Sequence, residues 1–359
     1  MIFGLSVSSS WGNGHATLWR GLIAALDGSG HEVSFFERDV AYYSAHRDLR
    51  ALGGRARLFL YPAWDDVRAL AARALADADA AIVTSYCPDG RAAAELVLGS
   101  RAIRVFYDLD TPVTLSRLAA GEDVTYLPVH GLGAFDLVLS YTGGDALDQL
   151  RARLGARRVA PLYGSVDPAH YRPVAAEPAW AAACSYLGTW SADRQARLDA
   201  LFLEPARRQR VRFVLGGSQY PDDIAWPDNV ARVDHVAPDA HPAFYCSSPV
   251  TVSVTRAAMA ATGFCPSGRL FEAAACGVPV LSDDWPGLDS FFTPGDEILI
   301  ARSTDDALGA LARPRRELAE IGRRARARVV DEHTASHRAA QLVALLETRG
   351  APAAIGAGA

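Results

Sequence analysis

The chain has 359 residues, half of them hydrophobic, and a net charge of -5. A chain of this length is expected to form two cores rather than one. The mildly acidic balance excludes the broad cationic face that general nucleic-acid binding requires. All 36 basic residues are arginine, a usage that we attribute to genome composition before function.

The cysteines and the N-terminus narrow the class of protein further. The five cysteines are scattered, without a C-x-x-C pair or a histidine cluster at metal-ligand spacing. We therefore expect reduced thiols and no metal. Met1 leads into a short apolar segment without a basic n-region, and no apolar stretch reaches about 18 residues. We expect a cytoplasmic protein with no transmembrane segment.

Apolar runs alternate with helical patterns from the first residues onward. Residues 2–7 read as a buried strand, and apolar residues at helical spacing follow over 18–26. The later runs are separated by segments long enough for crossover helices, so they predict a parallel sheet with helices on both faces. The further strands expected in the first half are 33–36, 80–84, 103–107 and 137–141.

A second series of strands begins after a stretch that contains Pro168, Pro173 and Pro178, which we interpret as an interdomain connection. Residues 315–346 predict one or two amphipathic helices. The expected strands are 185–187, 211–215, 230–233, 250–254, 278–282 and 298–301. The expected division is an N-terminal Rossmann-like domain 1–172, a C-terminal Rossmann-like domain 173–335, a helix 336–350 returning to the first domain and a disordered tail 351–359.

The first β-α turn, Ser-Ser-Ser-Trp-Gly-Asn-Gly-His over 8–15, lies directly between a strand and a helix. Gly12 and Gly14 permit close approach of the backbone, and the helix N-terminus offers free N–H groups to an anion. The third glycine of a dinucleotide-binding fingerprint is missing. His15 is a candidate base for an acceptor hydroxyl; the alternative is a histidine satisfied by local backbone.

A second strand-to-helix turn covers 187–194. Gly188 allows close backbone approach, and Arg194 lies where a guanidinium can hold a pyrophosphate bidentately. The alternative for Arg194 is a surface arginine paired with a carboxylate.

The densest segment is 266–283. Its apolar positions predict a helix that ends at Gly277 and a buried strand after it. Glu272 is a carboxylate within that apolar helix, and a vicinal diol such as a ribose would satisfy it. Arg269, one turn earlier, either adds charge at a diphosphate or neutralises Glu272.

This segment is similar to the signature helix of GT-B glycosyltransferases of the group 1 type, which carries an E-A-x-A-C-G-x-P-V run. The resemblance implies that Glu272 binds the ribose hydroxyls. The 188–194 turn resembles the same enzymes' G-R-L-x-x-x-K loop, with Thr189 in the arginine position and Arg194 in the lysine position. Residues 163–173 resemble their interdomain linker.

Four further segments, 10–15, 107–112, 254–256 and 271–292, look most like the CgeB-like branch of these enzymes. The likeness also places Gly216, Gly217 and Ser218 at the diphosphate, and His235 and Val236 in the loop whose backbone clamps the base. The chain departs from the pattern at Phe264, where many group 1 enzymes have an acid eight residues before the helix glutamate. Retention and inversion of the sugar's configuration therefore both remain open.

The resemblance implies an α/β fold of the GT-B type, with two Rossmann-like domains whose parallel sheets face each other across a cleft. The second domain would hold a nucleoside-diphosphate sugar, UDP-, dTDP- or GDP-linked, as donor substrate and without any cofactor. Backbone N–H groups and Arg194, together with Arg256 or Arg269, would stabilise the departing diphosphate without a metal. His15, Asp108 or Asp110 would act as the base for an acceptor from the first domain; the alternative for the two aspartates is turn capping.

Two other functions are compatible with the same residues. A sugar-nucleotide epimerase would use the donor site without a separate acceptor, and a non-catalytic protein that binds nucleotide-sugars would have lost the reaction. The sequence determines neither the base, the sugar nor the acceptor. It also leaves a homodimer open.

Overall fold

The computed structural model describes residues 1–348 of the chain, which fold as two compact units. The first contains Met1–Tyr163 and residues 336–348, and the second contains Gly164–Ala335. Residues 164–172 thus belong to the second unit, and not to the N-terminal domain in which we predicted them, because Val166 forms a bridge with Thr334 within that unit. The predicted tail 351–359 lies outside the described residues.

The first unit is built on a sheet of seven parallel strands in the order β3-β2-β1-β4-β5-β6-β7. The order reverses between β1 and β4, so the loops that follow these two strands diverge at the carboxyl edge, where open α/β sheets bind ligands. Its strands are β1 Ile2–Gly4, β2 Ser34–Arg38, β3 Arg57–Tyr61, β4 Ala80–Thr84, β5 Ile103–Asp108, β6 Leu137–Ser140 and β7 Val159–Pro161. Its helices are α1 His15–Gly28, α2 Ala41–Ser44, α3 Trp64–Ala76, α4 Gly90–Leu98, α5 Thr111–Ala119, α6 Asp145–Leu154 and α14 Ala335–Glu347, the last starting at the final residue of the second unit.

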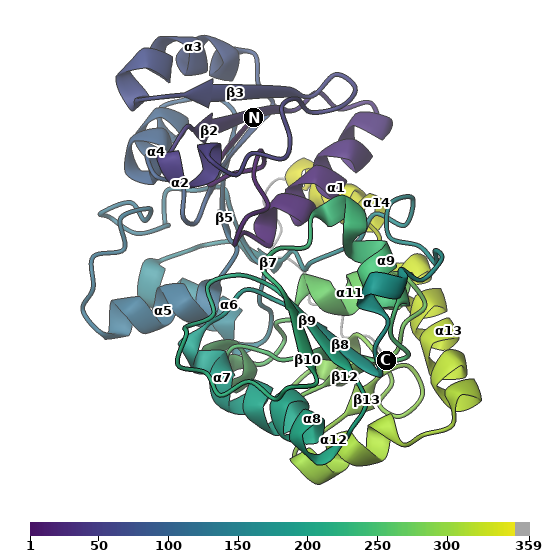
Figure 1. The fold of residues 1–359 in the computed structure, drawn as a ribbon. Helices are drawn as coiled ribbons and strands as arrows, with labels where there is room; N and C mark the ends of the chain where they lie inside the picture. Colours follow the sequence, from purple (N-terminus) through teal and green to yellow (C-terminus); the bar gives the residue numbers. More distant parts are fainter. Residues whose placement is uncertain (349–359) are drawn as a thin grey trace. The chain divides into compact units, whose positions relative to one another are not determined.

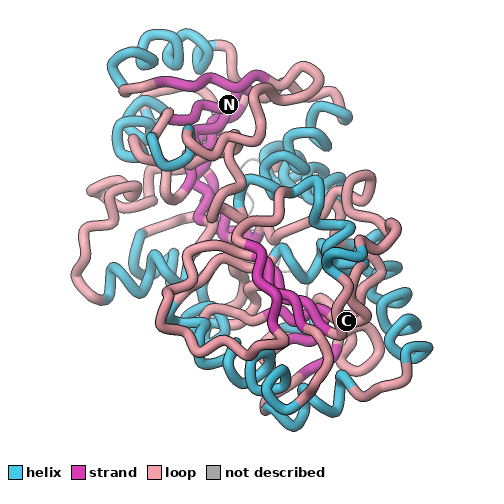
Figure 2. Tube along the Cα trace, in the orientation of Figure 1, coloured by secondary structure: helices cyan, strands magenta, loops and turns pink. Residues whose placement is uncertain are grey.

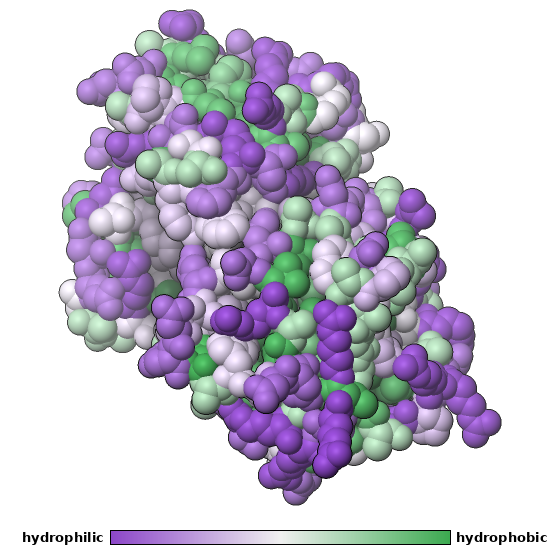
Figure 3. All heavy atoms as spheres, in the orientation of Figure 1, coloured by the Kyte–Doolittle hydropathy of each residue, from purple (hydrophilic) through white to green (hydrophobic). Residues whose placement is uncertain are grey.

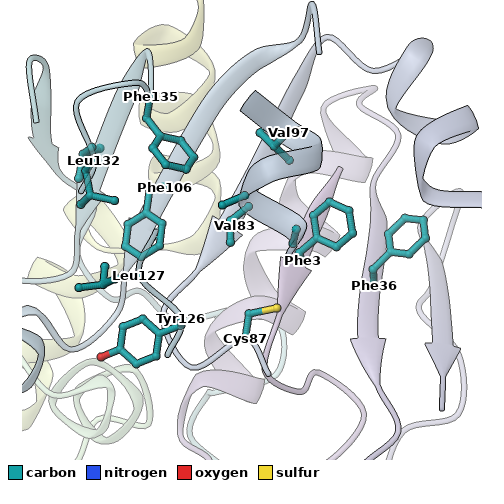
Figure 4. Close-up of a cluster of buried hydrophobic side chains, with 14 of the residues drawn as sticks. Phe3, Phe36, Val83, Cys87, Val97, Phe106, Tyr126, Leu127, Leu132 and Phe135 are labelled. Carbon is teal, nitrogen blue, oxygen red and sulfur yellow. The ribbon is translucent and has the colours of Figure 1, made fainter. Parts of the chain in front are cut away.

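Side chains alternate between the two faces of this sheet, as the period of a strand requires. Phe3, Val83 and Phe106 pack in the cluster on one face, which Figure 4 shows, whereas Ile82 and Val105 pack in the cluster on the other. The second cluster also contains Trp19 of α1 and Leu342 of α14, and Figure 1 shows these two helices side by side. The C-terminal helix therefore completes the core of the first unit.

The second unit repeats the arrangement with six parallel strands in the order β10-β9-β8-β11-β12-β13. The order reverses between β8 and β11, and in each unit Figure 2 shows the strands flanked by helices. Its strands are β8 Cys184–Leu187, β9 Phe213–Gly216, β10 Val230–Val233, β11 Thr251–Ser253, β12 Val280–Ser282 and β13 Leu299–Ile300. Its helices are α7 Ala192–Leu198, α8 Glu204–Arg208, α9 His241–Cys246, α10 Ala257–Thr262, α11 Gly268–Ala275, α12 Thr304–Leu311 and α13 Arg315–Glu332, with a π-helical turn Asp199–Leu203 between α7 and α8.

Two strands of the first unit were not predicted. Strands β3 and β7 are the two edge strands of its sheet. Four of the five residues of β3 are exposed or only partly buried, and β7 has three residues and ends at Pro161. The segment of β7 therefore lacks the continuous apolar run that marks the central strands of a parallel sheet, whereas β3 does contain such a run, over 58–61, which we did not predict as a strand.

The first strand is shorter than the predicted 2–7 because a buried carboxylate redirects the chain after Gly4. The side chain of Glu37, at the end of β2, is completely buried. Its Oε2 accepts hydrogen bonds from the backbone N–H groups of Val7 and Ser8, at 2.7 and 3.0 Å, and its Oε1 accepts from the hydroxyls of Ser6 and Ser8. These bonds replace strand pairing and fix the loop that leads into α1.

The surface carries mainly hydrophilic residues with apolar residues interspersed among them, as Figure 3 shows for one face of each unit. In the described part of the chain, no helix combines the length and apolar character needed to cross a bilayer.

Replacing Glu37 with glutamine tests the role of this carboxylate in the fold. One of the two acceptor oxygens becomes an NH₂ group that faces donors, so we expect Glu37→Gln to lower the free energy of unfolding by about 1–3 kcal/mol. Urea denaturation measures this value. The matched control is Glu32→Gln, because Glu32 is exposed and its contact with Arg57 is long, at 3.7 Å; its effect should stay within about 0.5 kcal/mol. Equal effects of the two substitutions would contradict the assignment.

Candidate functional site

The loop after β1 is held by side chains that do not belong to the sheet. The side chain of Asn13 donates to the carbonyl oxygens of Ser6 and Ser9, and its Oδ1 accepts from the backbone N–H of His15. Gly12 has a φ of 60°, which favours glycine. Gly14 differs, because its φ is -65° and a Cβ added to it would meet no atom of the protein within 4 Å. The space beside Gly14 is therefore open to a ligand.

The imidazole of His15, the first residue of α1, faces the carboxylate of Asp110. His15 Nε2 lies 3.8 Å from Asp110 Oδ1, and the two side chains are 21% and 15% exposed. Tyr86 follows β4 with a φ of 62°, and its ring centre lies 6.1 Å from that of His15. Burial and the carboxylate of Asp110, which bonds its hydroxyl, raise the pKa of Tyr86. The loops after β1, β4 and β5 thus bring three polar side chains together at the point where the strand order reverses.

Asp108 and Asp110 differ in the alternative predicted for them, turn capping, which applies to Asp108 but not to Asp110. Asp108 is completely buried, and its Oδ1 accepts from the Thr114 hydroxyl at 3.0 Å and from the Asp110 N–H at 3.2 Å, which is turn capping. Its Oδ2 has no hydrogen-bond partner. Burial raises the pKa of Asp108 from 3.8 to about 6, although the hydrogen bond from Thr114 opposes the shift. Asp110 forms no such cap with its side chain and faces His15.

In the second unit the loops after β8 and β9 touch through glycine. A Cβ on Gly188 would lie 2.8 Å from the Tyr186 hydroxyl and 2.9 Å from Nη1 of Arg269. Gly217 has a φ of 150°, and a Cβ there would meet the Gly188 carbonyl oxygen at 2.0 Å. Gly217 therefore requires glycine, and at Gly188 a side chain would have to displace Tyr186 or Arg269.

The three predicted arginines of this unit differ in their partners. Arg194 Nη1 donates to the hydroxyl of Tyr186 at 3.3 Å and to the carbonyl oxygen of Thr189 at 3.2 Å. Arg256 instead pairs with the carboxylate of Asp193 at 3.1 Å. The pairing with an acid that we considered for Arg194 is thus made by Arg256.

Arg269 is held by neutral oxygens. Its guanidinium donates to the carbonyl oxygens of Leu187 and Val254, each at 3.0 Å, and to the Ser267 hydroxyl. The alternative in which Arg269 neutralises Glu272 is not observed. Within residues 1–348, no carboxylate lies within ion-pair distance of Arg194 or Arg269, so no acid neutralises either charge beside the loop after β8.

Glu272 lies on the buried side of α11 and is 7% exposed. The hydroxyl of Tyr245, in α9, donates to its Oε2 at 3.2 Å. Burial and the Glu272 carboxylate raise the pKa values of Tyr245 and Tyr171. A carboxylate accepts up to about four hydrogen bonds, so tyrosine contacts and a ribose diol are compatible.

His235 and Val236 follow β10. Val236 is buried, and its carbonyl oxygen lies 3.0 Å from Nε2 of His241. Since a carbonyl only accepts, Nε2 carries the proton and Nδ1 accepts from the Tyr171 hydroxyl at 3.1 Å. Burial lowers the pKa of His241 and keeps it neutral. His241, Tyr171 and Tyr245 form the surroundings of Glu272, which the sequence motif alone did not indicate.

Comparison with known proteins places this geometry. Residues 194–344 match the sequence model of a family described as glycosyl transferase-like. A search of curated protein sequences gave no match. The match covers most of the second unit and its helix α11, and it confirms the predicted enzyme class, a glycosyltransferase.

Solved structures share the fold over nearly the whole chain. A sucrose-phosphate synthase from Thermosynechococcus elongatus has a TM-score of 0.71 at 17% identity, with 96% of this chain and 97% of that one covered. HepE from Anabaena, in complex with UDP and glucose, has a TM-score of 0.64 at 12% identity, with 96% and 98% covered. An alpha-glucosyltransferase in complex with UDP-glucose and DNA that contains an abasic site has a TM-score of 0.66 at 14% identity, with 97% and 98% covered. The predicted GT-B fold is confirmed.

The raised pKa of Asp108 predicts a dependence of stability on pH. Because the folded protein holds this proton up to about pH 6 and the unfolded chain only to about 3.8, the contribution of Asp108 to stability is present at low pH and is lost as the pH rises through about 6. Asp108→Asn stays neutral. We expect its free energy of unfolding, relative to the wild type, to rise by about 2–3 kcal/mol between pH 4 and pH 7.

Denaturation of both proteins across this range measures the difference. Asp66→Asn, at an exposed position of α3, is the control and should show no such rise. A difference between Asp108→Asn and wild type that does not change with pH would refute the prediction.

Proposed function

We propose that this glycosyltransferase takes a nucleoside-diphosphate sugar as donor in its second unit and transfers the sugar to a hydroxyl of an acceptor. The observation that carries the proposal is the pair of arginines, Arg194 and Arg269, that no carboxylate of the described chain neutralises at the carboxyl edge of the second sheet. Two uncompensated guanidiniums beside glycine-rich backbone are suited to a diphosphate.

The donor is assigned to groups that each meet one part of it. Arg194 and Arg269 offset the charge of the diphosphate, and Glu272 accepts hydrogen bonds from the ribose hydroxyls. The loop with His235 and Val236 lies along the base, and Gly188, Thr189 and Gly217 supply backbone close to the phosphates. Arg256 is shared with Asp193 and contributes less charge. UDP-sugars are the first donors to test, because structural relatives were solved with UDP or UDP-glucose.

The acceptor is assigned to the first unit. The acceptor oxygen forms a bond to the anomeric carbon while the bond from that carbon to the diphosphate oxygen breaks, and the diphosphate leaves with the electron pair. The acceptor proton passes to His15. Since Nε2 of His15 faces Asp110, Nδ1 is the nitrogen that receives the proton, and the Asp110 carboxylate stabilises the imidazolium. The open space beside Gly14 admits the acceptor to this pair.

Charge on the leaving group is balanced by the arginines and by N–H groups of the loops, so we propose that transfer needs no metal. Product analysis separates transfer from its rivals. Sugar found on a second molecule supports transfer, an altered free nucleotide-sugar indicates an epimerase, and binding without turnover indicates a protein that only holds the nucleotide.

Donor binding is tested with Arg194→Ala. Loss of one charge-assisted contact, worth about 1.5–3 kcal/mol, should weaken the binding of UDP-glucose by roughly 10- to 150-fold. Calorimetry with and without EDTA measures the Kd of UDP-glucose, and we expect EDTA to leave this Kd unchanged. Arg197→Ala is the matched control, because Arg197 lies on the same helix and donates to the carbonyl oxygen of Arg302. Equal binding by both variants, or binding that EDTA abolishes, would count against the proposed site.

The base is tested with His15→Ala and Asp110→Asn. We expect kcat for sugar transfer to fall by about 10²- to 10⁴-fold in His15→Ala, the usual contribution of a positioned base, while the Kd of the donor stays within twofold or so. Asp110→Asn should lose part of the same activity. His31→Ala, at an exposed position after α1, serves as control. Full activity of His15→Ala would remove its assigned role.

A further inference from the structure

Tyr186 is a completely buried tyrosine at the carboxyl end of β8, and no motif pointed to it. Its hydroxyl accepts a hydrogen bond from Arg194 Nη1 at 3.3 Å. The guanidinium of Arg269 lies over the ring of the same tyrosine, 5.5 Å from its centre. The hydroxyl and Nη1 of Arg269 both lie within 3 Å of where a Cβ of Gly188 would stand. One phenol thus sits between the two arginines assigned to the diphosphate.

Charge in this cluster is unbalanced. Arg194 comes from α7 and Arg269 from α11, and their other hydrogen bonds go to neutral oxygens. The nearest acid on α7, Asp193, is paired with Arg256. The flanking strands β9 and β11 carry no ionisable side chain. Two like charges held close together in partly buried surroundings repel each other unless an anion lies near them.

Tyr220 is the remaining ionisable group beside this cluster. Its hydroxyl donates to the Gly188 carbonyl oxygen at 2.8 Å, and that bond needs its proton. Burial and the neighbouring Tyr186 raise the pKa of Tyr220. For Tyr186, burial also acts to raise the pKa, but the charges of Arg194 and Arg269 and their hydrogen bonds outweigh it and lower the pKa below 10. The two neighbouring tyrosines are therefore displaced in opposite directions.

We propose that Tyr186 is the internal counter-ion of the diphosphate site, an anionic phenolate that holds the two arginines in the empty site and takes up a proton when a nucleoside diphosphate replaces it as their partner. This inference rests on the proposed donor function. It makes Tyr186 a positioning residue, because it is buried behind the arginines and acts through them on the ligand. Above the pKa of Tyr186 in the free protein, binding of the donor then takes up one proton from solvent.

The proton uptake has a definite sign. The protonated form of Tyr186 binds the diphosphate better, because an anion beside the guanidiniums disfavours the phenolate. Donor affinity is therefore constant below the pKa of Tyr186 in the free protein. Above it, affinity falls by about tenfold for each pH unit, until the pKa of the complex is reached.

The experiment compares the wild type with Tyr186→Phe and Tyr220→Phe. Phenylalanine keeps the ring beside Arg269 and removes only the ionisable oxygen, and Tyr220→Phe is the matched control at the neighbouring tyrosine. Near-ultraviolet absorbance of tyrosinate is titrated in the free protein and after addition of UDP-glucose. The Kd of UDP-glucose is measured over the same pH range. Ionisation of its uracil base affects all three proteins equally and therefore cancels in the comparison.

We expect the wild type and Tyr220→Phe to show one tyrosinate that ionises below pH 10, the ordinary tyrosine value, and that disappears when UDP-glucose binds. Tyr186→Phe should lack that tyrosinate and should lose the steep fall of affinity with pH. UDP-glucose that binds without removing the tyrosinate signal, or a titration unchanged by Tyr186→Phe, would overturn the inference while leaving the donor site intact. Absence of UDP-glucose binding in the wild type would instead overturn the proposed donor, and the titration of the free protein would still decide whether Tyr186 is ionised.

Discussion

The second unit depends on the unpaired positive charge of two arginines beside one strand end. Arg269 satisfies its hydrogen bonds with carbonyl and hydroxyl oxygens, so its direction is fixed while its charge is not cancelled. Arg194 is fixed in the same way by Thr189 and Tyr186. No carboxylate of the described chain pairs with these charges. They are therefore balanced only by an anion bound from solution or by another ionised group of the protein. The glycines at the same edge of the sheet leave room beside the backbone for an anion bound from solution.

The two units use the same topology but place their carboxylates differently. In dinucleotide-binding sheets an acid near the end of the second strand takes the ribose hydroxyls. Glu37 stands at that place in the first unit, yet all of its bonds go to residues 6–8 of the neighbouring loop. In the second unit Glu272 lies on a helix instead and contacts a tyrosine hydroxyl. Glu37 therefore holds a loop and is not available to ribose hydroxyls, which agrees with assigning the nucleotide to the second unit.

Periodicity was sufficient to predict the central strands, because buried parallel strands are continuous apolar runs. It failed at β7, whose three residues are too few for such a run, and at β3, whose apolar run over 58–61 we did not predict as a strand. The motifs indicated Arg194 and Glu272 as candidates, but not the residues that surround them in the structure. Tyr171 meets His241 across 70 residues, and Ser6 meets Glu37 across 31, and no local pattern encodes such pairs. The sequence also did not distinguish Asp108 from Asp110. These two residues of one turn differ in burial and in the groups around them, which no local pattern encodes.

Asp108 and Tyr186 show why burial by itself does not fix the charge of a group. Both are completely buried. Around Asp108 the partners are a hydroxyl and a backbone N–H, and burial raises its pKa toward the neutral acid. Around Tyr186 the partners are two guanidiniums, which lower its pKa and so favour the anion in spite of burial. Neighbouring full charges thus prevail over desolvation, whereas neutral donors do not. The buried Asp108 is held by the turn, whereas the partially exposed Asp110 faces His15, which is why we propose Asp110 as the acid that stabilises a proton on His15.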